Sequence, residues 1–306
     1  MIESRLGNGK RLEMAEQCLA RYEPALHQPG AVQDPAIMCL CYGAWGLFER
    51  GCASQSRVQV QRVLLLAQTL DHPFSHAVAQ GFAASVALFC GDHELGLQHA
   101  DEALRRCTAS TFQAWLAHAK VIRGRLRAAL GDARAGLAEM QEGYALWTAT
   151  GARITCATYL AFQAEVRLLL DEPREALQCL ASAQDIARRH GERYHAAELL
   201  RLQGLATWRL DPTRDGAQLA QRLLEQALAL AREQGKGGFV LRSALTLGRV
   251  LAAQGEPGRA AEGLRQACEA VPDHRETADY RDAQTALREW STDSQQGETG
   301  ASNVAI

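Results

Sequence analysis

Small apolar residues and turn signals recur along this chain with a period of about forty residues. The turns fall at Gly51, Gly91, Gly131, Asp171, Asp211 and Gly255. Their successive spacings are 40, 40, 40, 40 and 44 residues. Seven residues before each turn stands a small residue, namely Ala44, Ala84, Gly124, Ala164, Gly204 and Gly248. Seven residues are about two turns of an α-helix, so each unit is predicted to contain a helix that ends at its turn with the small residue facing inward.

A second set of small residues follows the turns by five positions. Its members are Ser56, Gly96, Gly136, Ala176 and Ala260, with Ala220 displaced by four. Small residues on facing helices let two backbones approach closely, so each unit is predicted to be a helix, a tight turn and a second helix. The displacement equals the extra length of the fifth unit, which predicts an insertion near Thr213 to Gln218.

The pattern predicts an all-α fold, a right-handed superhelical solenoid of about six stacked helix-turn-helix repeats. The first helices are expected near residues 35–50, 74–90, 112–130, 153–170, 194–210 and 238–254. The second helices are expected near 55–70, 93–107, 133–149, 174–190, 214–234 and 257–270. Asp34 is predicted to be the N-cap of the first helix. Gly151, Gly191 and Gly235 are placed to cap second helices at their C-terminal ends.

The two ends of the chain depart from the repeat. Residues 11–22 are similar to a second helix without its first, so residues 1–33 are predicted to be an N-terminal half-repeat or capping helix. The repeat domain is predicted over 34–274, and a polar-faced C-terminal capping helix over 275–290. The tail, 291–306, is rich in Ser, Gln, Gly and Thr and is expected to be disordered. An uncapped N-terminal end would expose an apolar face, through which a homodimer is possible.

Charge and composition narrow the classes of partner. The formal net charge is −2, from 33 basic and 35 acidic residues, and there is no basic stripe of the kind that nucleic-acid binding requires. Nine cysteines form no disulfide framework and are expected to be reduced thiols. No run of 18 uncharged apolar residues and no signal-peptide core is present, so no membrane segment is predicted. We expect a cytoplasmic protein.

Candidate catalytic and metal-binding residues do not form a set. Cys39 and Cys41 point in different directions on one helix, and His72 and His76 lack a third ligand, so no metal and no cofactor are expected. No G-x-S-x-G motif occurs, and the carboxylate pairs lie on predicted solvent faces. The sequence therefore favours a protein that is not an enzyme.

The last unit resembles the tetratricopeptide repeat through Leu247-Gly248, Ala260 with Leu264, and Pro272. The segments GYALWTATGA, ARRHGERYHAAELLRLQG and HRETADYRDAQTALREW also resemble a bacterial family, over roughly residues 11–290. That family is the C-terminal helical-repeat region of large predicted ATPases, many of which carry a class III adenylate/guanylate cyclase domain. The resemblance implies a repeat region that receives a regulatory input. No G-x-x-x-x-G-K-[ST] loop occurs in this chain, so ATPase and cyclase activities are not carried over.

The concave stripe of the first helices is the predicted binding surface, because first helices line the inner face of such arrays. Aligning the units on their small residues gives a stripe that passes from apolar to arginine-rich. The candidate partner-binding residues are Trp45, Phe48, His118, Arg125, Glu165, Glu198, Arg201, Trp208, Arg209, Arg242 and Arg249. Arginines placed close together can bind a carboxylate bidentately. The alternative is that Trp45 and Phe48 are core residues and that Glu198 pairs with Arg201 on its own helix.

Two functions fit these observations. The first is an interaction scaffold that binds a protein or peptide in the concave groove. The second is a sensory domain that binds a small ligand or signalling peptide, as part of an ATPase/cyclase-type regulator, and changes the curvature of the solenoid. An enzymatic site donated by another chain, and a repeat that recognises RNA, are less favoured because catalytic sets and basic faces are missing.

Overall fold

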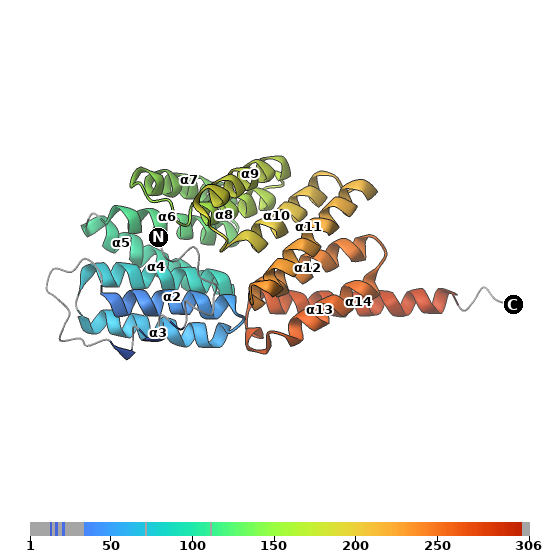
Figure 1. Cartoon of the computed structure of the whole chain (residues 1–306), viewed down its shortest axis with the longest axis horizontal. Helices are drawn as coiled ribbons and strands as arrows, with labels where there is room; N and C mark the ends of the chain where they lie inside the picture. Colours follow the sequence, from blue (N-terminus) through green and yellow to red (C-terminus); the bar gives the residue numbers. More distant parts are fainter. Residues whose placement is uncertain are drawn as a thin grey trace.

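Within the residues that the structure describes, the chain folds into six helical hairpins and a C-terminal helix, as a computed structural model shows (Figure 1). The described residues are 34–70, 72–110 and 112–301, together with 13, 16, 17, 20 and 21. The first helices are α2 (Pro35–Glu49), α4 (Pro73–Cys90), α6 (Gln113–Ala129), α8 (Cys156–Leu169), α10 (Ala196–Leu210) and α12 (Gly237–Ala253). The second helices are α3 (Ala53–Leu70), α5 (His93–Ser110), α7 (Ala133–Ala149), α9 (Pro173–His190), α11 (Arg214–Glu233) and α13 (Pro257–Glu269). A short 3-10 helix, η3 (Pro272–His274), precedes α14 (Ala278–Ala301).

The predicted first and second helices of the six repeats are present in the predicted order, and their ends agree within three residues. The described part of the chain contains helices and no strand, so the all-α repeat fold is confirmed. The predicted half-repeat at 1–33, and the homodimer contact assigned to it, fall almost entirely outside the described residues.

The turns have the backbone conformation that their glycines suggest. Gly51, Gly91, Gly131 and Gly255 have φ values of 93°, 82°, 104° and 84°. This left-handed region costs glycine little, because glycine has no Cβ. The fourth turn carries Asp171 instead, at a φ of 59°. The predicted C-caps Gly151, Gly191 and Gly235 also have positive φ, between 64° and 78°. The predicted N-cap is confirmed as well, since the Asp34 carboxylate accepts a hydrogen bond from the Ile37 N–H at 3.0 Å.

The small residues mark where paired helices touch. Gly124 on α6 faces Gly136 on α7, and a Cβ on either glycine would collide with the carbonyl oxygen of the other. In the first unit the Ser56 hydroxyl donates to the Ala44 carbonyl oxygen at 2.7 Å. The close approach predicted from the spacing of small residues is thus confirmed.

We expect Gly136→Ala to lower the free energy of unfolding by about 1–3 kcal/mol, because the added methyl group meets backbone that cannot move aside. Gly263→Ala is the matched control. Gly263 is also helical, but its Cβ would meet nothing within 4 Å, so the variant should gain up to about 1 kcal/mol from the higher helix propensity of alanine. Urea denaturation of both variants checks the sign. Equal effects would contradict the packing argument.

The insertion predicted in the fifth unit lengthens α11. This helix has 20 residues, whereas the other second helices have 13 to 18. The Thr213 hydroxyl caps its start by accepting from the Gly216 N–H at 3.5 Å. The extra residues therefore form an additional helical turn rather than a loop.

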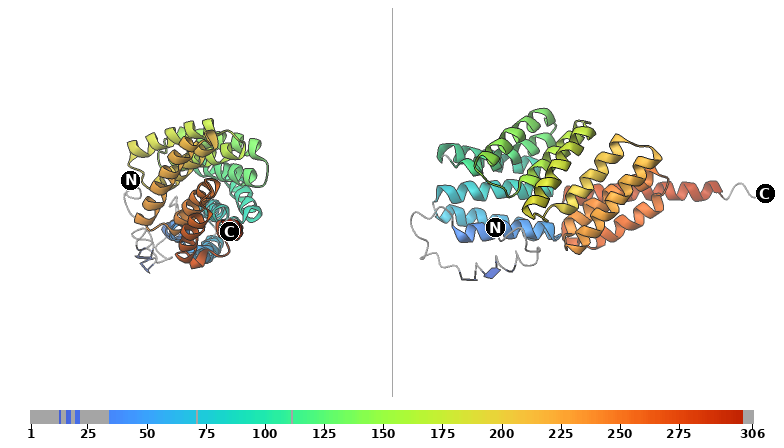
Figure 2. Two further views of the ribbon diagram at one scale, coloured as in Figure 1. Left: turned by 90° about the vertical axis from the view of Figure 1, so that its right-hand side faces the viewer. Right: turned by 45° about the horizontal axis from the view of Figure 1, so that its top comes forward.

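The solenoid closes on itself. The sixth unit returns to the first, so that α12 contacts α2 and η3 contacts α3 (Figures 1 and 2). The Ser54 N–H donates to the Asp273 carboxylate at 3.1 Å, although the two residues are 219 positions apart. Arg57 pairs with Glu276 at 3.3 Å. We call this contact between the first and last units the seam.

A buried ion pair lies at the seam. The Glu49 carboxylate and the Lys236 ammonium are 3.5 Å apart, and both side chains are only 3% exposed. Lys236 also lies over the rings of Tyr194, at 4.2 Å, and Phe239, at 5.1 Å. It further donates to the Tyr194 carbonyl oxygen. The seam is therefore held by charge and by cation–π contact as well as by close backbone packing.

The C-terminal helix is longer than predicted. The helix continues from Ala278 to Ala301, which corrects the expectation of a disordered segment from residue 291 to that point. Adding residues to an existing helix avoids the cost of nucleation, so a polar sequence can continue a helix whose first half is packed. Trp290 provides that packing, since it is 6% exposed and lies against Gly248 of α12.

One described helix, α4, is long and apolar enough to cross a membrane by those two criteria. However, 78% of it is buried inside the protein. Phe74, Val78 and Phe82 belong to the main hydrophobic cluster, so its apolar character is used in packing.

Candidate interaction site

The apolar half of the predicted groove is filled. Trp45 and Phe48 are 5% and 2% exposed. Phe48 stacks on Phe89 with ring centroids 5.4 Å apart, and Phe89 lies 6.2 Å from Phe162. Trp45 and Phe48 thus pack inside the ring of repeats instead of lining an open groove, whereas Phe89 and Phe162 also face the cavity described below. This corrects the expectation for Trp45 and Phe48 and agrees with the alternative that they are core residues.

His118 is also inside the protein. Its imidazole is 4% exposed and forms hydrogen bonds with Ser85, at 3.2 Å, and with the Tyr159 hydroxyl, at 2.7 Å. Burial lowers the pKa of His118 to about 4, so the ring is neutral at pH 7. The structure thus assigns it a place in a buried hydrogen-bonded chain and corrects its placement on the binding surface.

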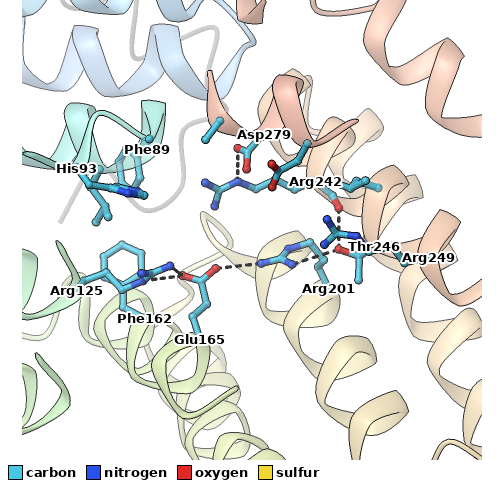
Figure 3. A pocket seen from close by; sticks show the side chains of 15 residues that line it. Phe89, His93, Arg125, Phe162, Glu165, Arg201, Arg242, Thr246, Arg249 and Asp279 are labelled. Carbon is cyan, nitrogen blue, oxygen red and sulfur yellow. Dashed lines mark hydrogen bonds and ion pairs between the residues drawn. The ribbon is translucent and has the colours of Figure 1, made fainter. Parts of the chain in front are cut away.

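Five of the predicted residues meet at one pocket. Arg125, Glu165, Arg201, Arg242 and Arg249 line a cavity of about 260 Å³ on the inner face (Figure 3). Glu198 lies beneath it, where it contacts Arg201 and Arg242. We call this cavity the arginine pocket. Trp208 and Arg209 do not line it, and Arg209 instead donates to the Leu168 carbonyl oxygen at 2.6 Å.

A chain of ion pairs runs across the floor of the arginine pocket. Arg125 and Arg201 reach Glu165 from opposite sides, at 3.2 and 3.1 Å (Figure 3). Arg201 also binds Glu198 through two hydrogen bonds, at 2.7 and 2.8 Å. Arg242 approaches Glu198 at 3.3 Å. The charges thus link α6, α8, α10 and α12, which are the first helices of four successive units.

The chain of ion pairs ends on α14, where Arg242 binds Asp279 at 2.7 Å. Asp279, His93 and Asp282 also line the pocket, although none of them is among the predicted partner-binding residues. The sequence contained a signal for Asp279 and Asp282, because α14 takes the position of the first helix of a seventh unit. Its polar residues could have been aligned with the inner stripe of the preceding helices.

The chain of ion pairs keeps the side chains that form it charged. Burial alone would raise the pKa of Glu198, but the charges and hydrogen bonds of Arg201, together with Arg242, lower it to about 2. Burial lowers the pKa of Arg242, but Asp279 and Glu198 outweigh it and raise that pKa. The pKa of His93 is lowered by burial and by the charge of Arg125, so this ring is neutral at pH 7. The pocket is therefore ionic and fixed, with a neutral imidazole at its edge.

Among the described residues, no group of three or more His, Cys, Asp or Glu side chains is placed to hold a metal ion. His72, considered above with His76, caps α4 instead by accepting from the Ser75 N–H at 3.3 Å. Burial raises the pKa of Cys41, Cys90 and Cys107, which keeps these thiols protonated and poorly nucleophilic.

Comparison with known proteins identifies the fold. No protein-family model matches the chain, and no curated protein matches it either. Among solved structures, the apo form of RapI is similar with a TM-score of 0.61 at 14% identity, covering 87% of this chain and 90% of RapI. A Rap protein complexed with Competence and Sporulation Factor gives 0.61 at 11% identity and covers 93% and 80%. Aspartyl phosphate phosphatase F from Bacillus subtilis gives 0.52 at 9% identity and covers 94% and 79%. The chain therefore has the tetratricopeptide-like solenoid fold predicted from its period.

Proposed function

We propose that this protein is a non-catalytic interaction module that binds a peptide, or an extended segment of a partner protein, at the arginine pocket. The observation that carries the proposal is the pocket itself, a cavity on the inner face that is lined by four arginines from three first helices. Guanidinium groups recognise carboxylates with defined geometry, and arginine is enriched at the centres of protein interfaces. The similarity to a Rap protein that was solved with a bound factor is consistent with ligand binding by this fold.

The closed shape limits the form of the partner. An α-helix with its side chains is about 10 Å across, and a site for a drug-sized ligand occupies roughly 300–1,000 Å³. The arginine pocket, at about 260 Å³, is smaller than such a site. We therefore infer that one or two side chains of the partner enter the pocket, while the rest of the partner lies across its rim.

The proposal is tested by selecting binders and locating them. A random peptide library displayed on phage is selected against the intact chain, and the enriched peptides are synthesised. The photo-crosslinking residue benzoylphenylalanine is then placed at Asp282 on the pocket rim or at Arg259 on α13, where the side chain is 55% exposed. We expect the peptides to crosslink from position 282 and not from position 259. Failure to enrich any peptide, or crosslinking from position 259 alone, would overturn the proposal.

We further propose that the protein acts in a regulatory system. The resemblance to the repeat regions of bacterial ATPase and cyclase regulators suggests that the bound segment belongs to a signalling protein of the cytoplasm. The chain of ion pairs supports this role, because it links four successive units and so connects ligand binding with the angle between repeats. Co-expression with an ATPase or cyclase from the same genome, followed by purification of a stable complex, tests this role independently of the pocket.

A further inference from the structure

The charges on the floor of the arginine pocket are already satisfied. Glu165 receives Arg125 on one oxygen and Arg201 on the other, and Arg242 is shared by Asp279 and Glu198. A ligand that competed for these arginines would leave the buried Glu198 carboxylate, or the half-buried carboxylates of Glu165 and Asp279, without a partner, which is costly. The floor therefore orders the pocket, and recognition falls to groups on the rim.

Among the described residues that line the pocket, Arg249 is the arginine with no partner. Its side chain lines the pocket, is exposed, and forms no hydrogen bond or ion pair with any described residue. It lies at the side of the pocket opposite Phe89 and His93 (Figure 3). Its register is shared with Arg125 and Glu165, since each of the three follows the small residue of its unit. Its planar guanidinium group can therefore donate two parallel hydrogen bonds to a ligand in the cavity.

The rest of the lining selects the kind of anion. Three carboxylates, those of Glu165, Asp279 and Asp282, also face the cavity and would repel a doubly charged group such as a phosphate more strongly than a single carboxylate. Phe89, Phe162 and Leu245 supply apolar surface beside the arginines. The lining thus combines one free cation with an apolar wall.

We propose that Arg249 binds the carboxylate of a Glu or Asp side chain in a peptide, whose neighbouring apolar residues pack against Phe89 and Phe162. This inference rests on the proposed function and gives the chemical class of the ligand. His93, neutral at the far edge, is placed to accept or donate one hydrogen bond to the peptide backbone.

The test uses two matched synthetic pools of nonapeptides, random except at the centre, where one pool carries Glu and the other Gln. We expect the wild-type chain to retain the Glu pool at least tenfold more than the Gln pool. Arg249→Gln should abolish the difference, and Arg249→Glu should instead favour a pool with Lys at the centre. Arg259→Gln, on the outer surface, serves as the control and should behave as the wild type does.

The outcomes separate the two proposals. If both pools are retained equally, peptide binding stands and the carboxylate inference is overturned. If neither pool is retained above a chain-free matrix, the proposed function and this inference both fail. Arg249 is exposed, so its variants should fold, and matching thermal melts by circular dichroism would establish this.

Discussion

Lys236→Met is expected to lower the free energy of unfolding by about 3–5 kcal/mol, because it leaves the buried Glu49 carboxylate without its partner. The loss includes the cation–π contacts with Tyr194 and Phe239. Because this pair spans the seam, the effect should be accompanied by a local one. Amide exchange at Ser54, whose N–H donates to Asp273, should become faster. Urea denaturation and hydrogen-exchange mass spectrometry measure the two effects.

The control for this variant is Lys120→Met. Lys120 pairs with Glu142 at 2.8 Å, but the two side chains are 26% and 65% exposed, and surface pairs contribute about 0–1 kcal/mol. The double variant Lys236→Met, Glu49→Leu should recover much of the loss, since an apolar pair often replaces a buried ion pair without cost. Equal stability losses for Lys236→Met and Lys120→Met would mean that the buried pair at the seam stabilises the protein no more than an exposed pair does.

Glu198→Gln is expected to lower the free energy of unfolding at pH 7 by about 3 kcal/mol, from the difference between the ordinary carboxyl pKa of 4.5 and the value of about 2 in the folded protein. A folded-state pKa below the ordinary value means that the folded protein binds fewer protons. The stabilisation is therefore present in full above pH 4.5 and is lost as the pH falls toward 2. The substitution removes the charge while keeping the shape, so the effect reports on the contacts with Arg201 and Arg242.

Comparison of the two proteins at several pH values measures this dependence. The difference in stability between wild type and Glu198→Gln should be constant from pH 5 to 7 and should shrink as the pH falls toward 2. Glu262→Gln is the control, because Glu262 also pairs with an arginine three residues later, Arg265, but in solvent, where the side chains are 59% and 51% exposed. A pH-independent difference for Glu198→Gln would show that its charge is not stabilised by the network.

The repeat could be predicted from sequence because it rests on local rules. Turn glycines with positive φ, small residues at helix contacts and an N-cap such as Asp34 act within one hairpin, so their spacing determined the helices and even the longer α11. The closure could not be predicted in the same way. It depends on small rotations between units that add up over six repeats, and on contacts such as Ser54 with Asp273 that no local pattern reveals.

The candidate site was predicted in part, because the face of a helix on which a residue lies is also a local property. The position of Arg125, Glu165 and Arg249 after the small residue placed them on the inner face, and the structure brings them to one pocket. The stripe also included Trp45 and Phe48, which share that face but are buried once the ring of repeats is complete. Phase along a helix says which side a residue faces. Whether that side is open depends on the curvature of the whole array.

The seam changes how this solenoid is expected to unfold. Linear repeat arrays behave nearly one-dimensionally, since each unit contacts only its neighbours and the ends can fray one unit at a time. Here the first and last units protect each other through contacts that are 219 residues apart. Neither the first nor the last repeat can unfold without breaking these contacts, so unfolding should be cooperative over the whole array. The same long-range contacts must be found during folding, which raises the contact order of a helical protein and should slow its folding relative to an open array of the same length.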